Sequence, residues 1–391
     1  AIAPYIITGR AKPRRLAFPF SGQGGQWWAM ARKLLTEDKT YRAFVETFDE
    51  ALKPYTGWSV IEEITRDEAT TRINDADVTQ AAIFSNQVGL YRMWRGRGLT
   101  PELLVGHSFG EVAATHIAGC IDLDTCAKII YHRGLIPHGS TRRGAMATLG
   151  VTYDQLAPLL PADASVVVAA YNGPTAQTIS GMEAPVVALL EEVKRLYPDV
   201  TARRLTMDFG WHSPHLDDCE AKFREGLGEI SWKTPAFPIV STVTGMLETC
   251  FDSEYWWQNL RQAVSYKKAI DFCLDLGIDA FLELGPHRTV TPLIHGIAQE
   301  RNASVVAVSS LERQGDDPLV MARSLASLYV NGVSFDWSES DTGAEEHLPL
   351  PRRPWVNERL VQLPLEARQF LFDSDRHPLL GWREIGPEPA W

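Results

Sequence analysis

Residues 103–119 read LLVGHSFGEVAATHIAG, and this stretch decides how the chain around it folds. Three apolar residues lead into Gly-His-Ser-Phe-Gly, and small residues that suit a helix follow. The pattern predicts a strand, a tight turn and a helix, as in the nucleophile-elbow motif G-x-S-x-G, which strains the Ser108 backbone and exposes its hydroxyl. The amide of Phe109 would start the helix, where free N–H groups stabilise negative charge. A purely structural turn is the weaker reading, given the strand before it and the helix after it.

Strands and helices alternate on both sides of this motif. Residues 16–35 read as a strand, a Gly-rich turn and a helix with Trp28, Ala31 and Leu35 on one face, and a second helix is expected from about Thr79. A third helix follows residue 122, with Asp122 or Asp124 as its N-cap. Such alternation predicts an α/β, hydrolase-like core with a parallel sheet, at residues 16–145 and 206–337.

The rhythm changes between residues 146 and 205, where the order is βαββαβ. This is the ferredoxin-like pattern, so we expect a small subdomain inserted into the core. Strands at AFPIVSTVTG and DAFLELGP then return to the main sheet. Residues 338–376, which include LPLPRRPW, are expected to be extended because each proline restricts itself and its predecessor.

Composition and charge argue against several classes of protein. The chain has 391 residues, 45% of them hydrophobic, and a net charge of -11. The acidic balance argues against a nucleic-acid-binding protein. Five scattered cysteines without metal-like spacing favour the cytoplasm, and the absence of a long apolar run or signal pattern argues against a membrane protein. The chain begins without Met, which we read as an excised piece of a longer protein.

A serine nucleophile needs a base and oxyanion donors. The segment DFGWHSPHLD holds His212 and His215 where the inserted subdomain rejoins the core, and we favour His212 as the base. We expect His107 to brace the loop and to point to the other side of the turn. The turn FSGQGGQ fits neither a dinucleotide fingerprint nor a P-loop, and the amide of Gln23 is its candidate oxyanion donor. Arg133 suits a carboxylate ligand, although a solvated surface arginine is the common alternative.

The blocks FSGQGGQ, GHSFGE, YHRG, GAMATLGV, YNGPTAQTISG and FGWHSPHLD, in this order, resemble the acyltransferase domain of type I polyketide synthases, relatives of malonyl-CoA:acyl-carrier-protein transacylases. The resemblance runs from about residue 16 to 337. Residues 1–15 would end a preceding linker, residues 338–376 resemble the linker after the domain, and residues 377–391 resemble the start of a dehydratase domain. A ketosynthase and a dehydratase would then be neighbouring domains.

The resemblance implies roles for individual residues. Ser108 would be the acylated nucleophile and His212 its base and acid, while Arg133 would hold the carboxylate of the extender unit. A main-chain carbonyl orients the histidine in this family, and the segment LGPH at residues 284–287 is our candidate. The residues expected to bind substrate or line the cleft are Gln23, His107, Phe109, Asn172, Phe209 and Trp211. The implied substrates are an acyl-CoA and an acyl carrier protein with its phosphopantetheine arm, with no tightly bound cofactor and no metal.

The extender unit is predicted from Phe209-Gly210-Trp211-His212. This departs from the His-Ala-Phe-His type of malonyl-specific domains and from the Tyr-Ala-Ser-His type of methylmalonyl-specific ones. The bulk of Trp211 favours malonyl, although Gly210 would let the ring swing aside. The alternatives are a methylmalonyl-specific or starter-unit acyltransferase, an acyl hydrolase and a non-catalytic scaffold module. The presence of Ser108, His212 and Arg133 together argues against the starter-unit acyltransferase, the acyl hydrolase and the scaffold module.

Overall fold

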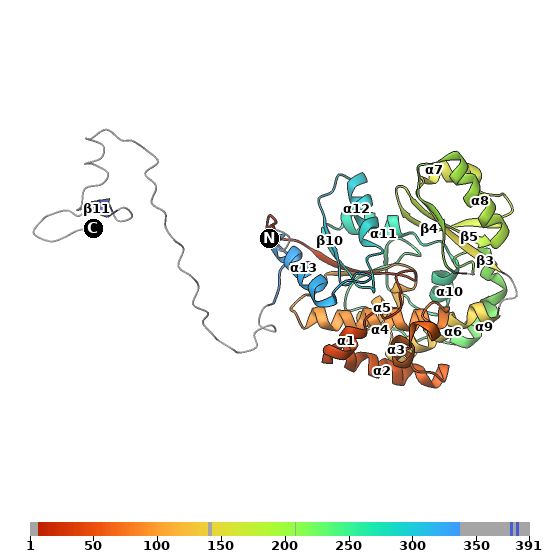
Figure 1. Cartoon of the computed structure of the whole chain (residues 1–391), viewed down its shortest axis with the longest axis horizontal. Helices are drawn as coiled ribbons and strands as arrows, with labels where there is room; N and C mark the ends of the chain where they lie inside the picture. The colour runs from red at the N-terminus through yellow and green to blue at the C-terminus, as the bar shows by residue number, and fades with distance from the viewer. Residues whose placement is uncertain (1–6, 140–142, 208, 337–375, 378–380, 383–391) are drawn as a thin grey trace, which may run out of the picture. The chain divides into compact units, whose positions relative to one another are not determined.

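A computed structural model of the chain describes residues 7–139, 143–207, 209–336, 376–377 and 381–382 (Figure 1). The chain divides into two compact units, Ala1–Thr342 and Gly343–Trp391. In the second unit β11 (Arg376–His377) pairs antiparallel with β12 (Gly381–Trp382). The linker and the dehydratase start predicted at residues 338–376 and 377–391 otherwise lie outside the described residues, so both stay predictions.

The first unit is built on a six-stranded sheet. The strands in spatial order are β10 (Val306–Ser309), β9 (Ala280–Glu283), β1 (Leu16–Phe20), β2 (Leu103–Gly106), β7 (Ile239–Val240) and β8 (Leu247–Glu248). Each neighbouring pair is parallel except β7 and β8. The predicted α/β core with a parallel sheet is therefore confirmed, and β8 and β10 extend it beyond the four strands expected.

Helices cover both faces of the sheet. Along each of the parallel strands the side chains point alternately to one or the other of two apolar clusters, so both faces of the sheet are buried. Phe18 and Phe20 of β1 lie in the cluster that includes α2 and α4, whereas Ala17 lies in the one that includes α11 and α12. The helices of this layer structure are α1 (Arg32–Glu37), α2 (Lys39–Thr56), α3 (Val60–Thr65), α4 (Ala76–Arg95), α5 (Gly110–Ile117), α6 (Leu123–Gly139), α9 (Glu220–Leu227), α10 (Ser253–Arg261), α11 (Tyr266–Asp275), α12 (Thr291–Glu300) and α13 (Asp317–Val330), with short 3-10 turns at η2 (Glu68–Thr70) and η4 (Pro214–Cys219). Before α6, Asp122 accepts a hydrogen bond from the Thr125 amide at 2.8 Å, which fits the predicted N-cap.

The inserted subdomain has a sheet of its own, with strand order β4-β5-β3-β6. Along the chain its elements are β3 (Gly144–Leu149), α7 (Tyr153–Leu156), η3 (Ala157–Leu159), β4 (Val166–Gly173), β5 (Ala176–Met182), α8 (Glu183–Leu196) and β6 (Ala202–Arg204). All three pairings are antiparallel, and the sheet packs against α8 around a separate apolar core. Order and topology match the predicted ferredoxin-like subdomain.

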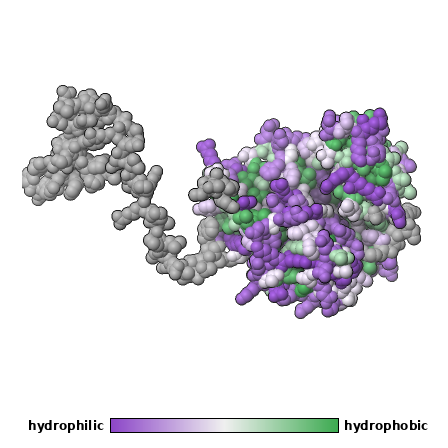
Figure 2. All heavy atoms as spheres, viewed as in Figure 1, coloured by the Kyte–Doolittle hydropathy of each residue, from purple (hydrophilic) through white to green (hydrophobic). Residues whose placement is uncertain are grey.

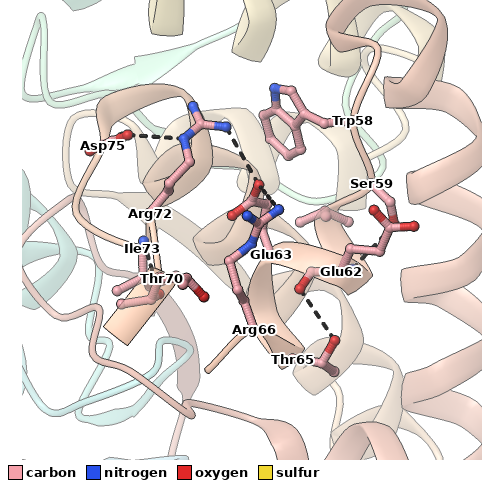
Figure 3. Close-up of polar contacts among 12 residues, drawn as sticks. Trp58, Ser59, Glu62, Glu63, Thr65, Arg66, Thr70, Arg72, Ile73 and Asp75 are labelled. Atoms are coloured by element: carbon pink, nitrogen blue, oxygen red, sulfur yellow. Dashed lines mark hydrogen bonds and ion pairs between the residues drawn. The ribbon is translucent and has the colours of Figure 1, made fainter. Parts of the chain in front are cut away.

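A cluster of ion pairs fixes the start of α4 (Figure 3). Glu63 of α3 is 2% exposed, and it pairs through Oε1 with Arg66 at 2.9 Å and with Arg72 at 3.4 Å. Arg72 also pairs with Asp75 at 3.1 Å and with Asp77 at 2.7 Å. Because Arg72 joins α3 to the first turn of α4, it holds in place the helix that carries Gln80 one turn later.

The surface is mixed in polarity. Figure 2 shows hydrophilic residues over much of one face, with apolar residues interspersed among them. Within the described ranges, no helix combines the length and the apolar character that crossing a membrane requires.

Candidate active site

Ser108 lies in the turn between β2 and α5, as the sequence predicts. Its φ is 51°, in the left-handed region that non-glycine residues rarely adopt. The flanking glycines are needed because other backbone lies close to them. A Cβ on Gly106 would lie 2.3 Å from the amide nitrogen of Glu111, and one on Gly110 would lie 2.4 Å from the carbonyl oxygen of Phe20. The glycines therefore permit the packing, while Ser108 itself carries the backbone strain.

Ser108 and His212 form a hydrogen-bonded pair. Ser108 Oγ lies 2.7 Å from His212 Nε2, and His212 Nδ1 lies 2.8 Å from the main-chain carbonyl oxygen of Gln262. A carbonyl oxygen only accepts, so the proton sits on Nδ1 and leaves Nε2 free to accept the serine proton. This arrangement suits nucleophilic catalysis by the serine.

The prediction that the segment at residues 284–287 supplies this carbonyl is wrong, since Gln262 supplies it. In that segment the carbonyl oxygens of Leu284 and Pro286 already accept hydrogen bonds, from the Ser21 amide at 3.3 Å and from Trp27 Nε1 at 3.1 Å. Gln262 follows the last residue of α10, a position with no local sequence signal for this role.

His212 is neutral at physiological pH. Burial, and after it the charge of the nearby Arg133 guanidinium, together lower its pKa from 6.5 to about 3, although the hydrogen bond to Gln262 acts in the opposite direction. The imidazole is therefore in its proton-accepting form before substrate arrives.

Arg133 is a buried cation held by neutral groups. It is 2% exposed, and its Nε donates to Gln80 Oε1 at 3.2 Å while its Nη1 donates to Asn259 Oδ1 at 2.9 Å. Burial lowers its pKa to about 10, and the charge of Glu111 opposes the shift, so the guanidinium stays protonated. A solvated surface arginine, the alternative from sequence, is thus excluded.

Ser108, His212 and Arg133 line one cavity of about 490 Å³. Its walls come from both subdomains, because Asn172 of β4 lines it together with Gln23 of the Gly-rich turn. A larger cavity of about 840 Å³ lies beside α12 and α13, but it contains neither Ser108 nor His212. The site is therefore the smaller cavity.

The remaining predicted residues divide between the cavity wall and its support. Trp211 lines the cavity, whereas Phe209 is buried with its ring centroid 5.2 Å from that of Trp211. The Phe109 side chain is also buried and lies against Arg133. His107 lines the cavity, as expected of a cleft residue, so the expectation that it points to the other side of the turn is wrong; its Nε2 lies 2.7 Å from Asn172 Oδ1. His107 thereby braces the elbow against β4.

Sequence reasoning missed three buried supports of the turn. The Ser108 amide donates to Thr242 Oγ1 at 3.3 Å, and its carbonyl oxygen accepts from Asn259 Nδ2 at 3.2 Å. Glu111 accepts from the Thr242 amide at 2.7 Å, and burial raises its pKa to about 7. Only Glu111 belongs to the motif GHSFGE, so only that residue had a local signal.

Known proteins are similar to this chain over most of its length. The family model described as the acyl transferase domain matches residues 17–334. An erythronolide synthase of Saccharopolyspora erythraea is 31% identical over 97% of this chain, which spans only 11% of that protein. The acyltransferase domain from the second module of the salinomycin polyketide synthase has a TM-score of 0.80 at 29% identity, covering 88% of this chain and 80% of that one.

A malonyl-CoA-acyl carrier protein transacylase from Clostridium perfringens shares the fold. Its TM-score is 0.70 at 21% identity, and the match covers 81% of this chain and 97% of that one.

Proposed function

This chain belongs to the acyl transferase domain family, and from that premise we propose that it moves a malonyl-type extender unit from coenzyme A to an acyl carrier protein. The acyl group would pass through an ester on Ser108 to the phosphopantetheine thiol of the carrier. One observation carries the proposal: the hydrogen-bonded Ser108–His212 pair shares its cavity with a buried, positively charged Arg133. A buried cation favours an acyl group with a free carboxylate.

The first half-reaction forms the ester. His212 Nε2 accepts the Ser108 proton while Oγ attacks the thioester carbonyl, and the carbonyl oxygen becomes an oxyanion. The amides of Gln23 and Phe109 are the proposed donors to that oxyanion, each worth on the order of 3 kcal/mol. The C–S bond then breaks, and His212 returns the proton to the departing coenzyme A thiolate.

The second half-reaction reverses these steps. The carrier thiol gives its proton to His212 and attacks the ester carbonyl, and the histidine then protonates the departing Ser108 oxygen. An acyl hydrolase would use water here, but a simple ester offers no partner for the Arg133 charge. No tightly bound cofactor takes part in this scheme.

Malonyl is the proposed extender unit because Trp211 is held in place. Its ring is 5% exposed and packs edge-on against Phe209, which packs in turn against His215. A Cβ on Gly210 would lie 3.0 Å from the Gly181 carbonyl oxygen and 3.2 Å from Ser213 Oγ, so close packing accounts for this glycine. A fixed indole leaves less room for a C2 methyl, a contact worth about 1–3 kcal/mol.

The setting proposed for this reaction is a multidomain synthase in the cytoplasm. The chain spans 11% of its erythronolide synthase relative, so a ketosynthase and a dehydratase as neighbours remain part of the proposal. The five cysteines are scattered along the sequence without metal-like spacing, which suits a reducing compartment.

Intact mass after brief incubation with malonyl-CoA, methylmalonyl-CoA or acetyl-CoA tests the proposal. A malonyl adduct is expected on the wild type, absent in Ser108→Ala and at least tenfold slower to form in Arg133→Ala, because that variant loses a charge-assisted contact. Incubation of the labelled protein with a phosphopantetheinylated carrier should remove the adduct. Labelling by acetyl-CoA alone, with no dependence on Arg133, would contradict the extender role and indicate a starter-unit enzyme.

A further inference from the structure

Asn259 connects two residues of the cavity, the nucleophile Ser108 and the buried cation Arg133. This α10 residue is 2% exposed and lies outside the cavity lining. Its Nδ2 donates to the main-chain oxygen of Ser108 at 3.2 Å, and its Oδ1 accepts from Arg133 Nη1 at 2.9 Å. A single planar amide therefore spans from the nucleophile to the buried cation.

At the Ser108 end, Asn259 helps to hold a strained turn. The Ser108 carbonyl also accepts from the Glu111 amide at 3.0 Å, and the Ser108 amide donates to Thr242 Oγ1. A residue with a φ of 51° keeps that conformation only when its surroundings fix it. Asn259 is the side chain that fixes the carbonyl oxygen from outside the turn.

At the Arg133 end, Asn259 directs the guanidinium without neutralising it. A guanidinium has five N–H groups, and the amide oxygens of Gln80 and Asn259 engage two of its nitrogens. Both partners are uncharged, so the positive charge remains available to a ligand. An aspartate at position 259 would occupy the same direction and cancel that charge.

We propose that Asn259 is a positioning residue that fixes the span between Arg133 and Ser108, so that the site measures the separation of a substrate's carboxylate from its thioester carbonyl. The inference rests on the proposed function and goes beyond it. One methylene separates the two groups in a malonyl thioester, and two separate them in a succinyl thioester. A rigid span favours the shorter acyl group, because a misplacement of about 1 Å costs on the order of a hundredfold in rate.

Single-turnover acylation of the purified chain by malonyl-CoA and by succinyl-CoA tests this, followed by intact mass. In Asn259→Leu, which keeps the branching of the side chain at Cγ and removes both hydrogen bonds, we expect the malonyl rate to fall roughly thirtyfold and the malonyl-to-succinyl ratio to fall about tenfold. Asn259→Asp should raise the KM for malonyl-CoA about tenfold, since its carboxylate competes for Arg133.

Two comparison variants separate the ends of the bridge. Thr242→Val removes the hydrogen bonds of its hydroxyl to the Ser108 amide and to Glu111 but leaves both side-chain partners of Arg133 in place, so both rates should fall with little change in the ratio. Gln80→Leu loosens only Arg133. The malonyl-to-succinyl ratio should therefore fall, mainly because the KM for malonyl-CoA rises. Gln258→Leu is the matched control on α10, since among the described residues this side chain hydrogen-bonds only Glu254 of its own helix. Circular dichroism and the thermal midpoint establish that each variant is folded.

The proposal is overturned if Asn259→Leu keeps the wild-type malonyl-to-succinyl ratio, as Thr242→Val should. A wild type that forms no acyl-serine with malonyl-CoA refutes the proposed function instead. In that event fluorophosphonate labelling of Ser108 tests the bridge, with malonate and succinate as protecting ligands. Malonate should protect the wild type more strongly than succinate and lose that advantage in Asn259→Leu, whereas equal protection in both proteins would overturn the inference.

Discussion

His212 owes its chemistry to its surroundings. Its φ is 58°, so both partners of the Ser108–His212 pair have backbones in the left-handed region. Burial and the neighbouring Arg133 cation both disfavour the imidazolium. A substrate carboxylate bound to Arg133 would offset part of that positive field. The histidine would then become a stronger base when a dicarboxylic acyl group is bound.

On the acid side of its pH profile, the acid limb, the acylation rate is expected to fall only at a pH far below the ordinary pKa range of histidine. With a His212 pKa of about 3, the rate for the free enzyme should stay flat from about pH 8 to about pH 5. In Arg133→Ala the lost cation raises the pKa, so the limb should move to higher pH. Stopped-flow acylation across this range measures both profiles. A wild-type midpoint near 6.5, or identical limbs in the two proteins, would contradict this account.

The same shift affects stability with a definite sign. The folded pKa of His212 lies below its unfolded value of 6.5. Below pH 6.5 the unfolded chain therefore binds a proton that the folded chain does not. The contribution of this group to stability is thus complete above pH 6.5 and is lost as the pH falls toward about 3.

Residues with a local signature were predictable from the sequence, and residues that act through distant contacts were not. Ser108 stands in a recognisable turn, and its motif identifies His212 and Arg133 through resemblance. Gln262 contributes a main-chain oxygen, which no residue type announces. Asn259 and Thr242 contact Ser108 from more than a hundred positions away, and such contacts follow only from the folded chain.

At the scale of single elements, strands were easier to predict than helix starts. Apolar runs bounded by turns gave β1, β2, β7 and β9. The helix predicted to include Trp28 begins only at Arg32, because Ala29 and Ala31 have φ values of 69° and 60°. Trp28 instead donates its indole N–H to the carbonyl oxygen of Arg66 at 3.0 Å. Tertiary contacts therefore overrode the helical pattern here.

The start of α4 depends on Arg72, so Arg72→Leu should lower the free energy of unfolding by about 1–3 kcal/mol. The variant leaves the buried Glu63 carboxylate with Arg66 as its remaining ion-pair partner and removes the links to Asp75 and Asp77. Urea unfolding measures the loss.

Arg42→Ala is the matched control for this test. Arg42 pairs with Glu46 on α2 at 3.5 Å, and both side chains are exposed. Such a pair contributes about 0.3–0.5 kcal/mol. Equal losses in the two variants would show that the cluster around Glu63 does not anchor α4.

At the scale of the whole first unit, the site exists because the inserted subdomain closes one side of the cavity. The hydrogen bond between His107 and Asn172 joins the elbow to β4, and Asn172 Nδ2 also donates to Thr178 Oγ1 at 3.0 Å. The βαββαβ order predicted this subdomain correctly. The bond that joins it to the elbow was not predictable, because it depends on how two separate sheets pack.

Asn172→Ala should slow acylation by malonyl-CoA about tenfold, because it removes this link and lets the cavity wall move. Hydrogen exchange should also become faster in β4 and β5. Asn331→Ala serves as the control. Asn331 follows α13, and the change removes its side-chain hydrogen bond to the carbonyl oxygen of Ser327. Unchanged exchange and an unchanged rate in Asn172→Ala would show that packing alone holds the subdomains together.

The carbonyl of Gln262 has a consequence for how this site tolerates change. A scan that replaces side chains one by one would find Ser108 and His212. It would not detect the Gln262 carbonyl that orients the histidine, because every amino acid offers the same main-chain oxygen. The amide side chain at position 262 is thus open to drift, while the path of the backbone there is not. Chemistry that depends on a peptide group is inherited through the fold, and only a change of shape after α10 can remove it.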